Sequence, residues 1–433
     1  MDSKVTHPEF LRLLFTDILG HTRSIELGYD RLDEVLENGI VIDGSSVPGY
    51  ASVNESDLLL LPSSATPTLQ PWDPAAAYII CTVHEISGQP HLSDPRYILR
   101  RIVDKAHKMG YQLMVGSELE FFTVRRLHDD TLVPLDRGGY FSSQPSDCGL
   151  DFRRDIIRTL QAVGIPTTSH HHEVAQGQEE IGLQYCSAEV AADNILLARL
   201  IISEIAYRRG LIATFMPKPF SNQNGSGMHL HQSVWDLQGE NNLFATERPS
   251  GISPLAMHFI GGLLEDAHEL AAILAPTVNS YKRLVPGFEA PTSIAWGYRN
   301  RSTMIRIPHF NGSKKSARIE IRCPDPSSSP HLAIAVLLAS GLAGIERKLD
   351  APVPTDRDVY KSLGSLESLP QSLVHALLRL ERSTIVRSAL GENVVDTLVR
   401  IRGQEWSEFI EATGDLPSSE ITPWEIERYL LTN

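Results

Sequence analysis

Two glutamates, Glu118 and Glu120, lie one residue apart in the otherwise apolar segment 115–122. The segment is predicted to be a β-strand, in which successive side chains point to opposite faces. Glu118 and Glu120 therefore share one face, and Leu119 and Phe121 share the other. Neighbouring carboxylates repel each other unless a cation lies between them. The pattern predicts a strand whose apolar face is buried and whose acidic face is either solvated or binds a divalent metal.

A second segment, residues 170–180, combines three consecutive histidines with Glu173 and Glu180. A third, residues 224–231, places His229 and His231 on one strand face after a glycine-rich turn. Taken singly, these segments are also typical of a surface histidine tract and of a hairpin turn. Together they increase the number of candidate metal ligands.

A fourth segment places Glu320 between Arg318 and Arg322 on one face of a predicted strand, which by itself is also typical of a surface salt-bridge ladder. Further arginines lie upstream at Arg283, Arg301 and Arg306. Guanidinium groups suit carboxylates and phosphates, and carboxylate-rich sites favour Mg²⁺ or Mn²⁺ over zinc. Metal ligands and arginines together are typical of phosphoryl transfer, which depends on positioning and charge neutralisation.

Length and charge restrict the class of protein. The 433 residues exceed one ordinary domain, so two unequal domains are expected. The chain has 39 Lys and Arg residues and 53 Asp and Glu residues, which gives a net charge of −14. This negative charge argues against non-specific binding of nucleic acid.

The longest apolar run, residues 332–345, is shorter than the ~20 residues of a membrane span and predicts a buried helix. The N-terminus lacks the apolar stretch of a signal peptide, and the four cysteines form no CxxC pair. We therefore expect a cytoplasmic protein with free thiols, without a membrane or nucleic-acid partner.

Local patterns predict the organisation of the chain. The first ~90 residues are expected to form short strands and turns, with a loop over residues 62–75. Asp94 and Pro95 mark the N-cap and first turn of a helix, so the domain boundary is placed near residue 92. Beyond it we expect helices over 97–109, 152–163 and 187–209, strands over 111–124, 227–234 and 317–323, and a mainly helical C-terminal third.

The polar motifs, taken in order, resemble those of the glutamine synthetase family. The matching segments are Asp43-Gly44-Ser45-Ser46, Glu55-Ser56-Asp57, residues 116–122, Gly138-Gly139-Tyr140-Phe141, residues 171–178, Met216-Pro217-Lys218-Pro219, and residues 224–231, 279–291, 300–308 and 318–326. Each motif is weak alone, but ten in order, spread from about residue 15 to 345, form a specific pattern.

The resemblance implies an α+β fold. A small β-grasp-like N-terminal domain, residues 1–92, would precede a large glutamine synthetase-type catalytic domain, residues 93–433, with an antiparallel sheet and flanking helices. It also implies two or three Mg²⁺ or Mn²⁺ ions per site. Glu120, Glu173 and Glu180 would hold one metal, and Glu118, His229 and Glu320 the metal beside the nucleotide phosphates. The active sites would lie between subunits of a homo-oligomer, a dodecamer in that family.

The resemblance further implies a two-step reaction of glutamate, ATP and ammonium. The γ-carboxylate of glutamate takes the γ-phosphate of ATP, and ammonia then displaces phosphate from γ-glutamyl phosphate. By motif, the catalytic residues would be Asp43, Glu289 and Arg301. The substrate-binding residues would be Ser46, Tyr140, Gly225, Arg283 and Arg322. The nucleotide-binding residues would be His171, His231, Arg301, Arg306 and Lys315. Asp43 would come from the neighbouring subunit and accept a proton from ammonium, and Glu289 would lie on a flap over the intermediate.

Two alternatives remain open at this level. The Asp43-Gly44-Ser45-Ser46 motif favours ammonia as the acceptor, but residues 142–144 depart from the family pattern on the route to the amine. A γ-glutamyl ligase for a polyamine or ethanolamine is therefore the close rival. Thr168, where a nucleotide-contacting Glu is usual, bears on ATP affinity. A non-catalytic regulatory paralogue is the second alternative, and it would not need all six metal ligands and Glu289.

Overall fold

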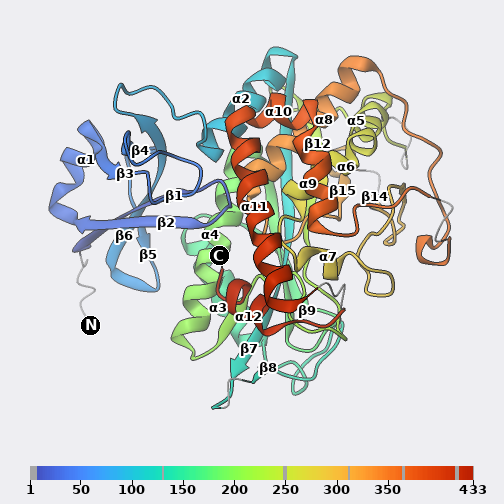
Figure 1. Ribbon diagram of the computed structural model, residues 1–433, viewed down its shortest axis with the longest axis horizontal. Coiled ribbons are helices and arrows are strands. Elements are labelled where there is room, and N and C mark those ends of the chain that lie inside the picture. Colours follow the sequence, from blue (N-terminus) through green and yellow to red (C-terminus); the bar gives the residue numbers. More distant parts are fainter. Residues whose placement is uncertain are drawn as a thin grey trace.

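The N-terminal part of the chain forms a six-stranded sheet around one helix. The computed structural model describes residues 7–128, 131–246, 251–310, 313–362, 366–414 and 419–432 (Figure 1). The strands of this sheet are β1 (Phe10–Thr16), β2 (Thr22–Gly28), β3 (Ile40–Asp43), β4 (Asp57–Pro62), β5 (Thr68–Gln70) and β6 (Asp73–Glu85). Their order is β2-β1-β6-β4-β3, with β5 on β6, and only β1 and β6 run parallel. The helix α1 (Leu32–Asn38) places Val35 in the core of this sheet, as expected for a β-grasp-like unit.

The loop predicted over residues 62–75 is wrong in part. Residues 68–70 form β5, and β6 already begins at Asp73. β5 is three residues long and pairs only with β6, so its sequence is too short to display the alternation by which strands are recognised.

A nine-stranded sheet forms the centre of the larger unit. Its strands are β7 (Tyr111–Arg126), β8 (Leu132–Pro134), β9 (Thr167–His172), β10 (Gln178–Ser187), β11 (Ile212–Thr214), β12 (Met228–Asp236), β13 (Trp296–Tyr298), β14 (Ile305–Ile307) and β15 (Ile319–Ile321). The order is β13-β14-β15-β12-β7-β10-β9, with β8 and β11 also paired to β7. All pairs are antiparallel as expected, except that β13 runs parallel to β14. The longest strand, β7, therefore lies at the middle of the sheet.

Helices cover this sheet and make up most of the C-terminal third (Figure 1). They are α2 (Pro95–Lys108), α3 (Leu150–Ala162), α4 (Ala188–Arg208), α5 (Pro254–Glu265), α6 (Ala267–Leu274), α7 (Ser280–Arg283), α8 (Pro330–Arg347), α9 (Leu373–Glu381), α10 (Thr384–Leu390), α11 (Glu392–Thr413) and α12 (Pro423–Tyr429). Short 3₁₀ turns are η1 (Tyr29–Arg31), η2 (Lys314–Ser316) and η3 (Val359–Ser362). The predicted cap is present, because the Asp94 side chain accepts a hydrogen bond from the backbone of Arg96.

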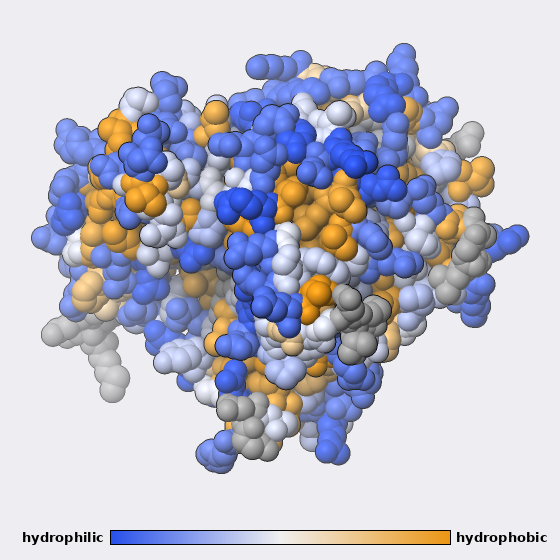
Figure 2. Space-filling model, viewed as in Figure 1, coloured by the Kyte–Doolittle hydropathy of each residue, from blue (hydrophilic) through white to orange (hydrophobic). Residues whose placement is uncertain are grey.

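The apolar run at residues 332–345 forms the buried centre of α8, as expected. No described helix is long and apolar enough to cross a membrane. All four cysteines are unpaired thiols. In the view of Figure 2, polar side chains cover much of the surface, and hydrophobic residues gather in separate patches, one of them over the N-terminal sheet on the left.

Buried charged side chains join the elements. Arg199 of α4 donates hydrogen bonds to the carbonyls of Gly20, Pro326 and Ser328, which connects the N-terminal sheet to the larger unit. Arg96 of α2 forms a two-pronged ion pair with Asp193 of α4, with distances of 2.9 and 2.7 Å. These contacts hold the scaffold on which the polar motifs converge.

Candidate active site

The centre of β7 brings the acidic motifs together. In the register of the sheet, Glu118 lies opposite His229 of β12, and Glu120 lies opposite Glu180 of β10. Both glutamates of β7 line one cavity of about 250 Å³. The predicted shared face is therefore present, and it points into a pocket.

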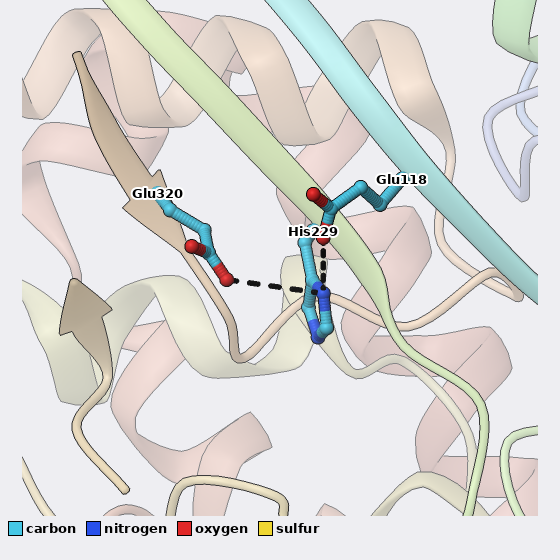
Figure 3. A group of neighbouring side chains, drawn as sticks. All are labelled: Glu118, His229 and Glu320. Carbon is cyan, nitrogen blue, oxygen red and sulfur yellow. Dashed lines mark hydrogen bonds and ion pairs between the residues drawn. The ribbon is translucent and has the colours of Figure 1, made fainter. Parts of the chain in front are cut away.

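One group of candidate ligands takes one residue from each of three adjacent strands (Figure 3). His229 Nδ1 lies 3.1 Å from Glu118 Oε2 and 4.0 Å from Glu320 Oε1 of β15. Candidate donor atoms of the three residues lie within 4.8 Å of one another. Burial alone would raise the pKa of Glu118, but His231 and His229 hold that pKa well below the ordinary carboxyl value. The group matches the predicted set Glu118, His229 and Glu320.

Two arginines neutralise Glu320. Arg306 Nη1 lies 2.5 Å from Glu320 Oε2, and Arg322 Nη1 lies 2.6 Å from Oε1. Burial would raise the pKa of Glu320, but Arg322 and the two histidines lower it to about 2. The ladder with Arg318 that the sequence also allowed is not formed, because Arg318 Nε instead contacts His231 Nδ1 at 3.2 Å. Glu320 is a carboxylate that stays charged inside the protein.

A second group contains His171, Glu173 and Glu180. His171 Nε2 lies 3.1 Å from Glu173 Oε1, and its Nδ1 lies 3.7 Å from Glu180 Oε1. Glu120, predicted to join Glu173 and Glu180, lines the same cavity but lies outside this group. Its Oε2 accepts hydrogen bonds from the Gly227 backbone and from Gln178 Nε2. His171, predicted to contact nucleotide, lies between Glu173 and Glu180.

Two of the acidic side chains in the cavity are difficult to ionise without a nearby cation. Burial and repulsion from Glu173 raise the pKa of Glu120 to about 8. Burial and repulsion from Glu118, Glu120 and Glu173 raise the pKa of Glu180 to about 10. Carboxylate oxygens with one histidine in each group form a donor set that suits Mg²⁺ or Mn²⁺. The residues present therefore fit divalent cations, which would supply the missing positive charge.

Arginines form much of the remaining wall of the cavity. Arg283 is buried, and its two terminal nitrogens donate to the carbonyls of Arg322 and Cys323 at 2.9 Å each. Arg301 Nη2 donates to the hydroxyl of Tyr140 at 3.2 Å. Gly225 also lines the cavity, and its carbonyl accepts a hydrogen bond from Gln178 Nε2. Four of the predicted substrate-binding residues thus line one cavity together with Arg301, which is predicted to be catalytic and to bind nucleotide; the four are Tyr140, Gly225, Arg283 and Arg322.

An adjoining cavity of about 410 Å³ shares Glu118 and Ser169 with the first. His231 and Lys315, both predicted to contact nucleotide, line this second cavity, whereas Arg301 and Arg306 line the first. Thr168, which departs from the family pattern, lies here too. His231 Nε2 lies 2.9 Å from Glu118 Oε1, and the Glu118 side chain lines both cavities.

Asp43 and Ser46 lie apart from both cavities, at the exposed end of β3 and in the turn that follows. The Asp43 carboxylate accepts hydrogen bonds from the hydroxyl and the backbone of Ser45, at 2.7 and 2.8 Å. These bonds lower the pKa of Asp43, so its carboxylate is charged at neutral pH. The structure of one chain does not bring these two predicted residues to the other site residues.

Motif reasoning did not identify Asp136, which organises the loop carrying Tyr140. Its carboxylate accepts hydrogen bonds from the backbones of Gly138, Cys148 and Gly177 and contacts His172 Nε2 at 2.8 Å. The Asp-X-Gly spacing before Gly139-Tyr140 is a turn signal that could have indicated this role.

Glu289 lies at the mouth of the cavity in an exposed turn with a left-handed backbone, φ +58°. Non-glycine residues adopt this conformation rarely, and such residues concentrate at functional sites. Its carbonyl accepts a hydrogen bond from Arg322 Nη2 at 3.3 Å. The segment that carries Glu289 therefore lies against the arginine wall.

Comparisons with known proteins agree with this geometry. Residues 92–429 match the family model described as glutamine synthetase, catalytic domain, and residues 7–86 match that described as glutamine synthetase, beta-Grasp domain. The glutamine synthetase of Methanocaldococcus jannaschii is 41% identical, over 99% of this chain and 96% of its own length. That of Thermotoga maritima is 42% identical, over 97% of this chain and 96% of its own.

Among solved structures, a protein named GmaS in complex with ADP superposes with a TM-score of 0.86 at 31% identity, covering 97% of this chain and 96% of that one. GmaS without ligand gives a TM-score of 0.84. The predicted β-grasp domain and catalytic domain are confirmed by these matches, and the family uses divalent metals and ATP. The chain belongs to the glutamine synthetase family and is an ATP-dependent ligase of that family, either a glutamine synthetase or a related γ-glutamyl ligase.

Proposed function

We propose that the protein is a glutamate–ammonia ligase, which forms glutamine, ADP and phosphate from glutamate, ammonia and ATP through γ-glutamyl phosphate. The observation that carries this proposal is the presence of two groups of candidate metal ligands, one on each side of β7, in a cavity that arginines also line. Two dense carboxylate groups beside arginines suit a transferred phosphoryl group, which needs charge neutralisation and alignment more than covalent chemistry.

The metal ligands are proposed as two sets. Glu118, His229 and Glu320 would hold the ion beside the nucleotide phosphates, and Glu120, Glu173 and Glu180 the ion beside glutamate. The proximity of His171 to Glu173 and Glu180 supports a further contribution from that histidine. When bound, two or three Mg²⁺ or Mn²⁺ ions would offset the charge of the phosphates and of the γ-carboxylate.

The chain's own residues would act in the following way. Arg283, Arg322 and the Gly225 backbone hold the glutamate carboxylate. His231 and Lys315 face the nucleotide, and Arg301 and Arg306 neutralise the transferred phosphate.

In the first step, a γ-carboxylate oxygen of glutamate attacks the γ-phosphorus of ATP, and ADP leaves. Ammonium gives a proton to Asp43, the resulting ammonia attacks the acyl carbon, and phosphate leaves with a proton from the attacking nitrogen. Ser46 and Tyr140 complete the ammonium pocket, and Glu289 shields the intermediate from water.

The position of Asp43 implies that the working site spans two copies of the chain. Its charged carboxylate and Ser46 lie apart from the cavities of their own chain, so we propose that they complete the site of a neighbour in a cytoplasmic homo-oligomer, a dodecamer. The proposed domain boundary lies near residue 92, between the end of β6 at Glu85 and the start of α2 at Pro95.

One observation favours the second candidate, a γ-glutamyl ligase for an organic amine. Phe141 is 64% exposed and packs on Tyr140, with ring centroids 3.9 Å apart, at the rim of the cavity. Aromatic faces attract organic cations. The turn that holds this pair closes through Ser142, whose hydroxyl accepts a hydrogen bond from the Gly139 backbone. Ser142 belongs to the segment that departs from the family pattern.

An amine panel distinguishes the two candidates. Glutamate-dependent phosphate release is measured with Mg²⁺ and ATP, with ammonium, putrescine or ethanolamine varied. We expect ammonium to stimulate release most. Saturation by putrescine or ethanolamine at far lower concentration than ammonium would overturn the ammonia proposal. Asp43→Asn is the matched control, because it is expected to abolish stimulation by ammonium while glutamate and nucleotide still bind.

A further inference from the structure

The flap, defined here as residues 286–290, is held at three successive residues. Phe288 lies over the ammonium group of Lys218, with Nζ 3.4 Å from the ring centroid. The Glu289 carbonyl accepts from Arg322, and the Ala290 carbonyl accepts from the hydroxyl of Tyr360 at 3.1 Å. Two of these contacts fix the backbone. Only the contact with Lys218 acts on a flap side chain.

Lys218 is an unusual residue to find inside a protein. Its side chain is 1% exposed, and its Nζ makes no hydrogen bond to any described residue. Burial, with Arg283 nearby, lowers its pKa to about 8. A buried ammonium without a hydrogen-bond partner is costly, and a desolvated cation over an aromatic face is among the stronger contacts available to it.

The backbone of Lys218 belongs to the rigid scaffold. Its N–H donates to Asn279 Oδ1 at 2.6 Å, and its carbonyl accepts from Asn279 Nδ2 at 3.0 Å. Asn279 also donates to Glu425 of α12 at 2.9 Å. Lys218 is thus a fixed point, whereas residues 286–290 form turns without helix or strand.

Lys218 does not line the reaction cavity, but Phe288 and Glu289 do. A direct contact of this lysine with glutamate or phosphate is therefore not indicated. We propose that Lys218 is a positioning residue, which holds the flap over the cavity through the face of Phe288. This proposal rests on the ligase function above and on the role of Glu289 in excluding water.

The consequence concerns the fate of the activated intermediate. If Phe288 is released, the flap can swing away before the amine arrives. Water oxygen then attacks the γ-acyl carbon of γ-glutamyl phosphate, phosphate leaves, and glutamate is regenerated. ATP is consumed without amide formation. The ratio of phosphate released to amide formed therefore reports the position of the flap.

The test compares five proteins: the wild type, Lys218→Met, Phe288→Leu, Phe288→Tyr and the double variant Lys218→Met/Phe288→Leu. Lys218→Met keeps the length of the side chain and removes its charge, so we expect equal or higher thermal stability. The ratio of phosphate to amide should rise about tenfold in Lys218→Met and Phe288→Leu. Phe288→Tyr keeps the aromatic face and should retain the wild-type ratio. In the double variant Lys218→Met/Phe288→Leu, the ratio of phosphate to amide should be no higher than in either single variant.

Backbone hydrogen exchange of residues 287–290, the flap residues that carry an N–H group, gives a second readout that does not require activity. Exchange should be faster in Lys218→Met and Phe288→Leu than in the wild type and Phe288→Tyr. A wild-type ratio and wild-type exchange in Lys218→Met overturn the proposal. If Lys218→Met does not fold, a wild-type ratio in Phe288→Leu overturns it equally. Failure of every amine in the panel would instead reject the proposed function, and the exchange measurement would still decide the role of Lys218.

Discussion

Gly225 lies in close contact with Pro217 and Arg283, and a side chain at this position would force these two neighbours apart. A Cβ at this position would lie 2.4 Å from the Pro217 carbonyl and 2.9 Å from Cγ of Arg283. The first neighbour is backbone, and the second belongs to an arginine whose terminal nitrogens are held by two carbonyls. Neither can move without disturbing the wall of the cavity.

Gly225→Ala is therefore expected to lower the affinity for glutamate. We expect the KM for glutamate to rise about tenfold or more, and the free energy of unfolding to fall by about 1–3 kcal/mol from overpacking. Gly403→Ala is the control, because a Cβ at this position in α11 meets nothing within 4 Å. That change should raise stability by about 0.5–1 kcal/mol and leave the KM unchanged. Equal glutamate KM values in Gly225→Ala and the wild type would contradict this account.

Among individual residues, those whose roles follow from local geometry could be predicted from the sequence. The shared face of Glu118 and Glu120 follows from strand alternation, and both line one cavity. The contacts of Arg283 and Asp136 could not be predicted in the same way. They bond to carbonyls or amides up to 41 residues away, and only the folded chain brings those partners near.

Three helices meet at one carboxylate whose side chain is 15% exposed. Asp193 of α4 accepts from Arg96 of α2, and its Oδ1 lies 2.9 Å from His331 Nε2 of α8. Burial would raise the pKa of Asp193, but Arg96 and His331 lower it strongly. This contact between α2, α4 and α8 stabilises the layer behind the central sheet.

Asp193→Asn is expected to lower the free energy of unfolding by about 3–5 kcal/mol at pH 7, because it leaves Arg96 buried with an uncharged partner. The folded-state pKa of Asp193 lies below the unfolded value of about 3.9, so the ion pair contributes fully above that pH. The difference between wild type and variant should therefore shrink as the pH falls below about 4. Denaturant unfolding at several pH values measures it. Asp104→Asn, an exposed change on α2, should alter stability by less than about 0.5 kcal/mol.

Elements with an apolar period and a cap could be predicted well, as α2 and α8 illustrate. Asp94 is the N-cap of α2, directly before Pro95, and the apolar run of α8 is buried as expected. The strand β5 and the parallel pair β13 and β14 could not be predicted. Each is three residues long, so its conformation depends on its neighbours in the sheet rather than on its own pattern.

At the scale of the whole molecule, the proposed active site is incomplete in one chain. Asp43 lies in the N-terminal sheet, on the left of Figure 1, and it does not line the cavity of the larger unit. Resemblance to the family predicted that this carboxylate comes from a neighbour. Composition and periodicity could not predict it, because they do not describe contacts between copies.

Complementation between inactive variants tests this arrangement. Asp43→Ala and Glu120→Ala are each expected to be inactive alone. In co-expressed mixed oligomers, roughly a quarter of the sites should combine two intact halves and recover activity. The separately purified variants, mixed without subunit exchange, are the control. If co-expression recovers nothing although mixed oligomers form, Asp43 acts within its own chain or not at all.

The proposed site divides between two kinds of backbone. Glu118, Glu120, Glu180, His229 and Glu320 lie on paired strands at the centre of the sheet, whereas Asp43, Tyr140 and Glu289 lie at a strand end or on turns. Loops accept substitutions and insertions that a central strand does not, because one inserted residue in a strand turns every following side chain to the opposite face. Selection can therefore alter the nucleophile that such a ligase accepts by changing loops alone. The strand residues that are proposed to activate the carboxylic acid substrate are under a separate and stricter constraint, because the register of β7 fixes where their side chains point.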